Sequence, residues 1–192
     1  MNFDNQIILE NDLISLSPLS HSHLDKLLPF VLSNPDLLKY SPSPFGTTKA
    51  FEAYIKKAIS ARNKKERYPF VIFDKKSNQY IGSSSYGKFS FENQRLEIGW
   101  TWIFKEFQGA GINSQAKFLL LDYAFHQLKM VRVVFKTDVR NVASRKALEK
   151  IGATLECILR SHTVLQDGYR RDTAVYSILK EEWIEIYKSR KL

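Results

Sequence analysis

The sequence predicts one mixed α/β domain, and three features of the chain predict it. Strand-like segments at residues 68–73, 79–89 and 96–104 follow one another across short polar turns, which is typical of an antiparallel meander. A helical segment separates 96–104 from the β-branched run 131–137, so these two strands are expected to be parallel, with a right-handed crossover. An Asp-Gly pair at 167–168 joins two long apolar segments and predicts a final hairpin.

The segment before the meander is expected to hold one strand and two helices. Residues 12–16 form the strand, and Ser20 is a plausible N-cap for a helix that ends at residues 34–35. Two prolines and a glycine mark residues 40–46 as a loop. Thr47 or the next threonine then caps a second helix, whose apolar side chains recur with helical spacing and predict a core-facing stripe. These side chains are Phe51, Tyr54, Ile55, Ala58 and Ile59.

The segment after the meander is expected to alternate between helices and strands. Residues 115–128 read as a buried helix, and a shorter helix runs from a cap at Asn141 to residue 151. The hairpin strands are expected at 155–165 and 169–179, before a terminal helix at 181–187. No internal repeat or linker interrupts this order, so we expect residues 1–192 to form a single domain.

Composition narrows the class of protein. The chain has 192 residues, of which 44% are hydrophobic, and no apolar run approaches the ~20 residues of a membrane span. The first residues lack a basic segment followed by an apolar one, so we expect no secretion signal and a cytoplasmic protein. The single cysteine, Cys157, excludes an internal disulfide and is expected to be a small core residue. The net charge of +9 is spread along the chain, which favours a solvated surface and one anionic ligand.

The chemistry of the chain is expected to centre on the glycine-rich stretch 108–114. Gly109 and Gly111 lie between the predicted strand 96–104 and the predicted helix, and no acidic side chain falls between them. Glycine allows positive φ and close approach of a ligand, and a helix start offers unpaired N–H groups to an anion. This stretch therefore predicts a pyrophosphate-binding turn, with an ordinary tight turn as the alternative.

Several motifs together carry a family resemblance. They are Gln108-Gly-Ala-Gly-Ile-Asn113, the strand Leu96-Glu-Ile-Gly-Trp-Thr-Trp102, Asn141-Val-Ala-Ser144, Leu148-Glu-Lys-Ile-Gly-Ala153 and the hairpin Asp167-Gly-Tyr-Arg-Arg-Asp172. The chain resembles the GNAT superfamily of N-acetyltransferases, in its RimJ/RimL-like branch, over nearly its whole length. One position departs from the superfamily pattern, because Asn113 stands where glycine or alanine is usual.

The resemblance implies acetyl-CoA as the donor, an amine as the acceptor and direct transfer in a ternary complex. It implies that strands 96–104 and 131–137 splay apart and that the pantetheine arm of CoA fills the gap. The backbone of Trp102, Ile103 and Phe104 would bind the pantetheine amides or the thioester oxygen, and the Asn141 side chain would bind the same arm. The pyrophosphate would be held by Gln108, Gly109, Ala110, Gly111, Ile112, Asn113 and Ser114. Arg140, Arg145 or Lys146 could meet the 3′-phosphate.

Two side chains are predicted to act on the reacting groups. An alkylamine is mostly protonated at neutral pH, so transfer needs a proton acceptor. Glu97 is the candidate base because it lies on the strand beside the expected thioester, with a surface carboxylate as the alternative. By the resemblance, Ser144 is the candidate proton donor to the departing thiolate, or a group that orients it, although a serine in the first turn of a helix also has a purely structural role.

The acceptor pocket is expected between the loop 40–46, the second helix and the final hairpin. Candidate lining residues are Tyr40, Phe45, Tyr86, Trp102 and His162. The acceptor is either a small amine or a protein N-terminus. Some relatives in the family are dimers, so a homodimer is one assembly that the resemblance allows. No His, Asp or Glu spacing suits a metal, and no membrane or nucleic-acid partner is expected.

Two other functions are compared with this one. A dinucleotide-dependent oxidoreductase would need a third glycine at Ser114 and an acidic residue in a second strand about 20 residues on, and the chain has neither. A non-catalytic CoA-binding module would keep the affinity for acetyl-CoA but lack turnover that depends on an amine.

Overall fold

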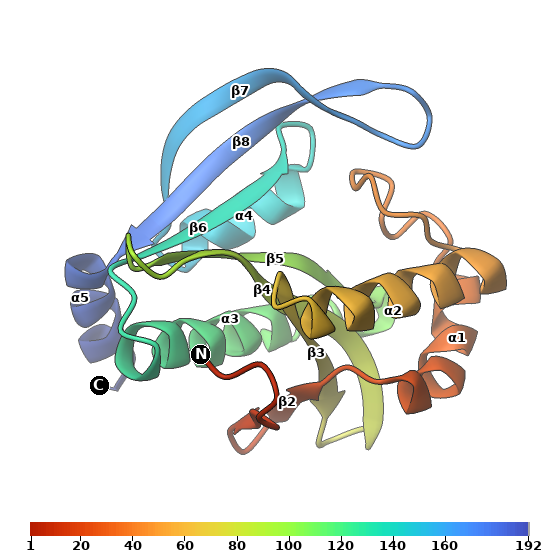
Figure 1. The fold of residues 1–192 in the computed structure, drawn as a ribbon, viewed down its shortest axis with the longest axis horizontal. Helices are drawn as coiled ribbons and strands as arrows, with labels where there is room; N and C mark the ends of the chain where they lie inside the picture. The colour runs from red at the N-terminus through yellow and green to blue at the C-terminus, as the bar shows by residue number, and fades with distance from the viewer. Residues whose placement is uncertain (192) are drawn as a thin grey trace.

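The computed structural model describes residues 1–191 and consists of one eight-stranded sheet with helices on both faces (Figure 1). The strand order is β1-β2-β3-β4-β5-β6-β8-β7, and every neighbouring pair is antiparallel except β5 and β6. The mixed sheet, its meander, its parallel pair and its final hairpin confirm the fold class predicted from the sequence. The strands are β1 Leu9–Glu10, β2 Ile14–Pro18, β3 Arg67–Asp74, β4 Gln79–Ser90, β5 Arg95–Ile103, β6 Arg132–Asp138, β7 Thr154–Val164 and β8 Arg170–Leu179.

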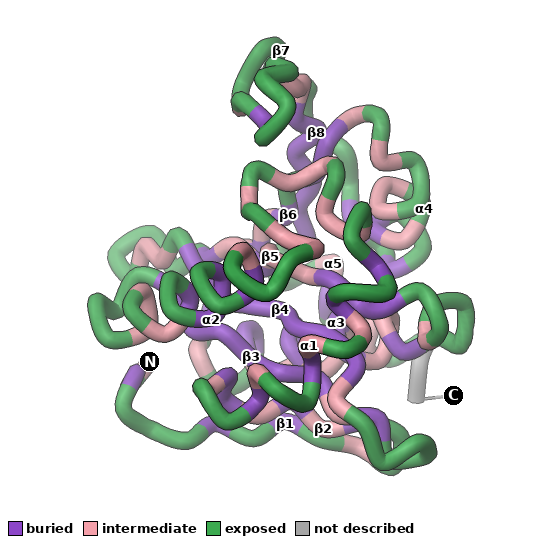
Figure 2. The backbone as a smooth tube through the Cα atoms, turned by 90° about the vertical axis from the view of Figure 1, so that its right-hand side faces the viewer, coloured by how far each residue is buried: buried purple, intermediate pink, exposed green. Residues whose placement is uncertain are grey.

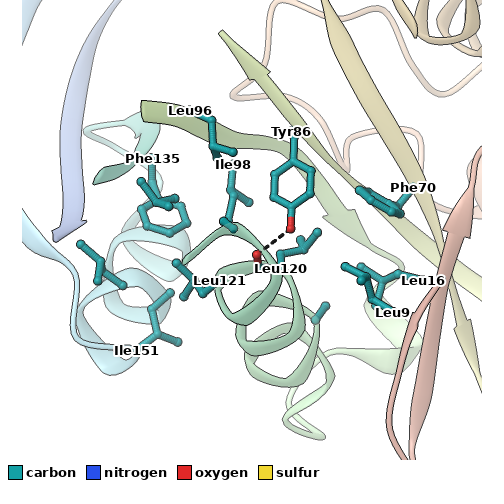
Figure 3. Packing of buried hydrophobic residues seen from close by; sticks show 14 of the residues in the cluster. Leu9, Leu16, Phe70, Tyr86, Leu96, Ile98, Leu120, Leu121, Phe135 and Ile151 are labelled. Atoms are coloured by element: carbon teal, nitrogen blue, oxygen red, sulfur yellow. Dashed lines mark hydrogen bonds between the residues drawn. The ribbon is translucent and has the colours of Figure 1, made fainter. Parts of the chain in front are cut away.

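The helices divide the core into two layers. One layer packs α3 (Ile112–Asp122), α4 (Val142–Lys150) and α5 (Lys180–Lys191) against one face of the sheet. Figure 3 shows this layer, where Leu120 and Leu121 of α3 lie beneath Leu96 and Ile98 of β5. The other layer packs α1 (Leu24–Ser33) and α2 (Thr48–Asn63) against the opposite face. The stripe predicted on the second helix is buried there at Phe51, Tyr54, Ile55 and Ala58.

The parallel pair β5–β6 is joined only at its beginning. Arg95, Leu96 and Glu97 of β5 pair with Arg132, Val133 and Val134 of β6, and no later residue of β5 pairs with β6. Figure 1 shows β6 and β8 rising away from the line of β5 beyond this point. The sheet therefore opens at its centre, as expected, and both strands have unpaired backbone along the opening.

A bulge in β5 lies beside this opening. Between the pairs Ser83–Trp102 and Ser85–Gly99, β4 contributes one residue and β5 contributes two. One of the two, Trp100, has φ +50°, a left-handed conformation that is uncommon outside glycine. Such a bulge bends the strand and redirects its side chains, so it contributes to the divergence of β5 from β6.

Several elements differ from the sequence expectation. The third helix begins at Ile112 instead of residue 115, because the left-handed Gly111 (φ +78°) starts the helical turn directly. It ends in a π-helical turn, Tyr123–Gln127, that helical periodicity alone does not reveal. Cys157 is exposed on the edge strand β7, so its predicted place in the core is wrong. Figure 2 shows most of the β7 backbone as exposed. A strand covered on neither face cannot bury a small apolar side chain.

Candidate functional site

The glycine turn before α3 has the conformation that the sequence predicts. Gly109 and Gly111 have φ +85° and +78°, and beyond the adjacent backbone no atom lies within 4 Å of where a Cβ would stand on either residue. Their conformation, and not crowding, therefore requires glycine, and the space in front of the turn is open. Gln108 contributes differently, because its side-chain amide donates to the Ile103 carbonyl over 2.7 Å and fixes the turn to the end of β5.

The start of α3 fits an anionic group such as pyrophosphate. No side chain caps the helix, so the first N–H groups are not used in that way. Asn113 Oδ1 is buried and has no hydrogen-bond partner among residues 1–191, so this turn holds an orphaned polar atom. An anion here would meet N–H groups and the positive end of the helix dipole, in a turn without a carboxylate. The two glycines and the uncapped helix start therefore suit an anionic group, whereas the Asn113 oxygen would accept a hydrogen bond from a donor.

A buried lysine lies at the opening between β5 and β6. Lys117 extends from α3 to Thr101 of β5, where its Nζ donates to Oγ1 over 2.5 Å, and Nζ lies 5.6 Å from the centre of the Phe135 ring on β6. Burial lowers the pKa of Lys117 from 10.5 to about 7. None of the ion pairs among the described residues includes Lys117. Sequence reasoning missed this residue, because a lysine in a helix normally reads as solvated.

The three backbone donors predicted on β5 are not equivalent. The N–H of Phe104 donates to the Ile81 carbonyl of β4 over 3.0 Å, so it is not available to a ligand and this prediction is wrong. Trp102 pairs with Ser83 and Ile103 with Gly82 on β4, and strand alternation directs the N–H of Ile103 away from β4, toward the opening. Ile103 is therefore the member of the three whose N–H best suits a ligand in the gap.

Glu97 is the last residue of β5 that pairs with β6, so its side chain lies where the opening begins. Leu96 and Ile98 face α3, and alternation therefore puts Glu97 on the opposite face, with Lys136 of β6. Its Oε2 lies 3.3 Å from Lys136 Nζ, and the side chain is 14% exposed. The Glu97 carboxylate and the Lys136 ammonium therefore form an ion pair where the opening begins.

Asn141 and Ser144 lie at the start of α4, where β6 ends. The side-chain oxygen of Asn141 accepts from the Ser144 N–H over 3.1 Å, which confirms the predicted N-cap. The Asn141 Nδ2 group and the Ser144 hydroxyl make no hydrogen bond to the described residues. Both side chains are partly exposed, so both polar groups remain available to a ligand.

Two of the three cations considered for the 3′-phosphate are already engaged. Arg140 binds Asp138 through Nη2 to Oδ2 over 2.8 Å, and its guanidinium lies 3.8 Å from the centre of the Tyr169 ring. Burial tends to raise the pKa of Asp138, but hydrogen bonds from Arg140 outweigh burial and lower it. Arg145 donates to the Tyr176 hydroxyl over 3.1 Å. Lys146 is exposed and makes no hydrogen bond or ion pair with the described residues, so it stays the candidate.

The loop before α2 and the final hairpin meet as predicted. Arg171 of β8 donates to the Tyr40 carbonyl over 2.8 Å, and Gln166 donates to the Ser43 carbonyl over 2.6 Å. Burial lowers the pKa of Arg171, against the opposing effect of nearby Asp138 and Glu97. These contacts put Tyr40 on the same side of the sheet as Glu97. The hairpin and the loop therefore contact each other on the Glu97 side of the sheet.

The predicted acceptor residues fall into two groups. Tyr86 is fully buried and its hydroxyl donates to the Leu120 carbonyl over 2.6 Å, so its predicted place in the pocket is wrong (Figure 3). Alternation of side chains along β4 places Tyr86 on the sheet face that packs against α3. Trp102 is 3% exposed and its ring centre lies 5.4 Å from that of Phe45, so it is packed beneath Phe45. Phe45 is half-buried, and exposed His162 lies on β7 with Nδ1 3.1 Å from Thr173 Oγ1.

Comparison with known proteins identifies the family of this site. Residues 14–154 match the family described as the acetyltransferase (GNAT) domain. The chain belongs to the GNAT acetyltransferase family. A GCN5-related N-acetyltransferase from Brucella melitensis has a similar structure, with a TM-score of 0.88 at 26% identity, over 99% of this chain and 86% of that one. The RimJ/RimL-like branch and the GNAT fold predicted from the sequence are therefore confirmed.

Two curated GNAT relatives match over part of their length. YdaF of Bacillus subtilis (strain 168) is 41% identical over 91 residues, which cover 47% of this chain and 49% of YdaF. The ribosomal-protein-serine acetyltransferase of Escherichia coli (strain K12) is 33% identical over 100 residues, which cover 52% of this chain and 54% of that protein. The chain thus matches about half the length of each of these relatives.

The described residues of this GNAT chain form neither a metal centre nor a membrane-spanning helix. Among the described residues, no group of three or more His, Cys, Asp or Glu side chains is arranged to hold a metal ion. No helix within residues 1–191 has the length and apolar character that crossing a membrane requires.

Proposed function

We propose that the protein is an N-acetyltransferase that moves an acetyl group from acetyl-CoA to a primary amine, by direct attack in a ternary complex. The observation that carries this proposal is the opening between β5 and β6, with an uncapped glycine turn before α3. An extended, anionic ligand suits these two features together, because the turn offers N–H groups and the opening offers unpaired strand edges.

The chain's own residues would hold acetyl-CoA at both ends of its arm. The turn 108–114, with its two left-handed glycines and a helix start that no side chain caps, supports a pyrophosphate site. The N–H of Ile103 and the Nδ2 group of Asn141 support contacts to the pantetheine amides. The positive net charge of +9 favours the approach of this polyanion. Acetyl-CoA supplies the activated acetyl group, and no metal is part of the proposal.

Transfer requires proton movements that two side chains suit. The amine must lose a proton to attack the thioester carbon, and the partly buried Glu97 carboxylate would take it, directly or through water. The C–S bond then breaks, the new C–N bond remains, and the thiolate takes a proton. The unengaged Ser144 hydroxyl at the start of α4 supports a role as donor or as an orienting group.

The acceptor would enter between the loop 40–46 and the β7–β8 hairpin, past Tyr40, Phe45 and His162. It is a small amine or a protein N-terminus. The E. coli relative, named as a ribosomal-protein-serine acetyltransferase, supports a protein acceptor. A single domain spanning residues 1–192, a cytoplasmic location and a homodimer belong to the same proposal, and light scattering after gel filtration measures the assembly.

Calorimetric titration with acetyl-CoA, with NADH as the comparison, tests the donor. We expect saturable binding of acetyl-CoA with one site per chain and no heat from NADH. Absence of acetyl-CoA binding would overturn the proposal, and binding of NADH would favour the oxidoreductase. Release of free CoA thiol that depends on an added amine then separates an enzyme from a non-catalytic CoA-binding module.

A further inference from the structure

A cavity of about 140 Å³ lies on the sheet face opposite α3. It is smaller than the ~300–1,000 Å³ of pockets that enclose whole ligands, so it suits one group of a larger substrate. We name it the Arg67 pocket. Its lining comes from the loop before α2, from α2 and from β3 and β5: Ser43, Pro44, Ala53, Tyr54, Lys57, Arg67 and Trp100.

Arg67 is a buried cation without an anion. Its residue is 6% exposed, and no carboxylate of the described residues forms an ion pair with it. Nε donates to Ser85 Oγ over 2.8 Å and Nη2 donates to the Tyr54 hydroxyl over 3.0 Å, whereas Nη1 makes no hydrogen bond to the described residues. The guanidinium also lies 4.7 Å from the centre of the Trp100 ring. A buried charge is costly unless a partner compensates it, so this arrangement favours an anionic ligand.

The other polar groups of the pocket are donors as well. The Tyr54 hydroxyl accepts from Arg67 Nη2 and from the Trp102 indole N–H, each over 3.0 Å. Its two acceptor positions are thereby filled, and its own O–H remains to be donated. The Lys57 side chain adds a second positive charge at the exposed rim. No carboxylate lines the pocket, so it matches an acceptor of hydrogen bonds and not a donor.

The pocket lies next to the proposed base. The Trp100 ring covers Gly87, where a Cβ would meet ring atoms at 2.6 Å. Gly87 is the cross-strand partner of Glu97. The ring that forms one wall of the pocket therefore lies beside the position at which Glu97 projects from the same face. A group bound near Arg67 would be connected to an amine near Glu97 by a short linker.

We propose that the Arg67 pocket binds a carboxylate of the acceptor, so that the preferred substrates are amines that also carry a carboxylate. The inference rests on the proposed acetyl transfer and names the acceptor class for that site. A carboxylate fits better than a phosphate, because one uncompensated buried charge is neutralised by a monoanion. Its two oxygens can also accept from Nη1 and from the Tyr54 O–H at the same time.

Matched acceptor pairs test the proposal with acetyl-CoA at saturation. The small pair is 4-aminobutyrate and 4-aminobutyramide, and the peptide pair is Ser-Glu-Ala amide and Ser-Gln-Ala amide. We expect the carboxylate member of at least one pair to have a kcat/KM about 10- to 100-fold higher, which is the range for charge-assisted hydrogen bonds. The pair that discriminates identifies the source of the carboxylate. Equal rates in both pairs would overturn the proposal.

Variants connect the preference to the pocket. Arg67→Gln should reduce the preference to within about 3-fold by slowing only the carboxylate member. Lys57→Gln, at the exposed rim, should reduce it partially without disturbing the core. Lys56→Gln changes a neighbouring exposed lysine that does not line the pocket, and it should leave the preference intact. A preference that survives both pocket variants overturns the proposal.

Two measurements separate this inference from the proposed function. Calorimetry with acetyl-CoA alone reports the donor site, and calorimetry with 4-aminobutyrate alone reports the pocket without any transfer. Acetyl-CoA binding without carboxylate discrimination would overturn only the Arg67 pocket. Binding of 4-aminobutyrate that Arg67→Gln abolishes, in a protein that does not bind acetyl-CoA, would overturn only the proposed transfer. Stronger selection of O-phosphoethanolamine over ethanolamine than of either carboxylate would overturn the choice of carboxylate.

Discussion

The carboxylate of Glu97 has two neighbours that bear on its chemistry. Its Oε2 lies 3.3 Å from Lys136 Nζ, and the strand opening begins at its own position. We expect Glu97→Gln to lower kcat/KM by about 10²-fold or more, since general acid–base catalysis contributes this much. The affinity for acetyl-CoA should be unchanged. Steady-state rates from pH 6 to 10 measure the effect, because loss of a base removes its limb of the pH–rate profile.

Lys136→Gln is the matched control for this substitution. It breaks the same ion pair but keeps the carboxylate, so it should retain most of the activity. If both variants lose activity equally, the ion pair serves to position the strands and Glu97 is not the base. If Glu97→Gln keeps the wild-type pH–rate profile, the role of base also fails.

Individual residues were the hardest to predict from sequence. Tyr86 and Trp102 read alike as aromatic strand residues, yet Tyr86 lies in the core beneath the sheet and Trp102 faces the pocket layer. The face that Trp102 takes depends on the β5 bulge at Trp100, and no residue type marks that bulge. Lys117 and Arg67 read as solvated charges. Their burial follows from packing between elements that are distant in sequence, which local pattern does not carry.

At the scale of elements, α4 joins a structural role to a binding role in one side chain. Asn141 caps the helix through Oδ1 and leaves Nδ2 unengaged. Asn141→Ser keeps a capping oxygen but removes the amide donor, so stability should change by less than about 0.5 kcal/mol while the affinity for acetyl-CoA falls several-fold. Urea unfolding and calorimetry measure the two effects separately.

Asn141→Ala removes both functions and serves as the comparison. It should destabilise the protein by about 1 kcal/mol, and its affinity for acetyl-CoA should fall as far as that of the serine variant. If Asn141→Ser binds acetyl-CoA as tightly as the wild type, the side chain is only a helix cap.

Elements were predictable where a local rule decides them. The Asp-Gly turn at 167–168, the glycine turn before α3 and the cap at Asn141 each depend on a short stretch, and each was located correctly. The short strand β1 and the π-helical turn at Tyr123–Gln127 have no such signal. The two-residue strand β1 forms because β2 offers an edge to pair with, which is a tertiary effect.

At the scale of the whole molecule, the sheet holds two hydrophobic layers together while its centre is open. The opening is bridged from below by Lys117, whose Nζ bonds Thr101 on β5 and lies near Phe135 on β6. A charged group in this position costs stability, because it is fully desolvated and has no anionic partner among the described residues. The global stability of the fold should therefore depend on the protonation of this one amine.

The sign of this dependence follows from the pKa of Lys117, which burial lowers from 10.5 to about 7 in the folded protein. Between these two values the unfolded chain binds a proton that the folded protein does not, so this residue makes stability rise with pH. Its cost is complete below about pH 7 and vanishes above the pKa of the unfolded chain. Lys117→Met fills a similar volume without the charge and should remove the dependence.

We therefore expect Lys117→Met to stabilise the protein more at pH 6 than at pH 9, with a difference of roughly 3 kcal/mol between the two increments. Urea unfolding of the wild type and of Lys117→Met at the two pH values measures this difference. Because the other titrating groups are the same in both proteins, their contribution to the pH dependence cancels when the two increments are compared. Lys146→Met, which changes an exposed lysine, should show no such difference. An equal increment for Lys117→Met at both pH values would mean that the amine remains protonated in the fold. In that case water or an anion must reach the opening between β5 and β6 and solvate the charge there.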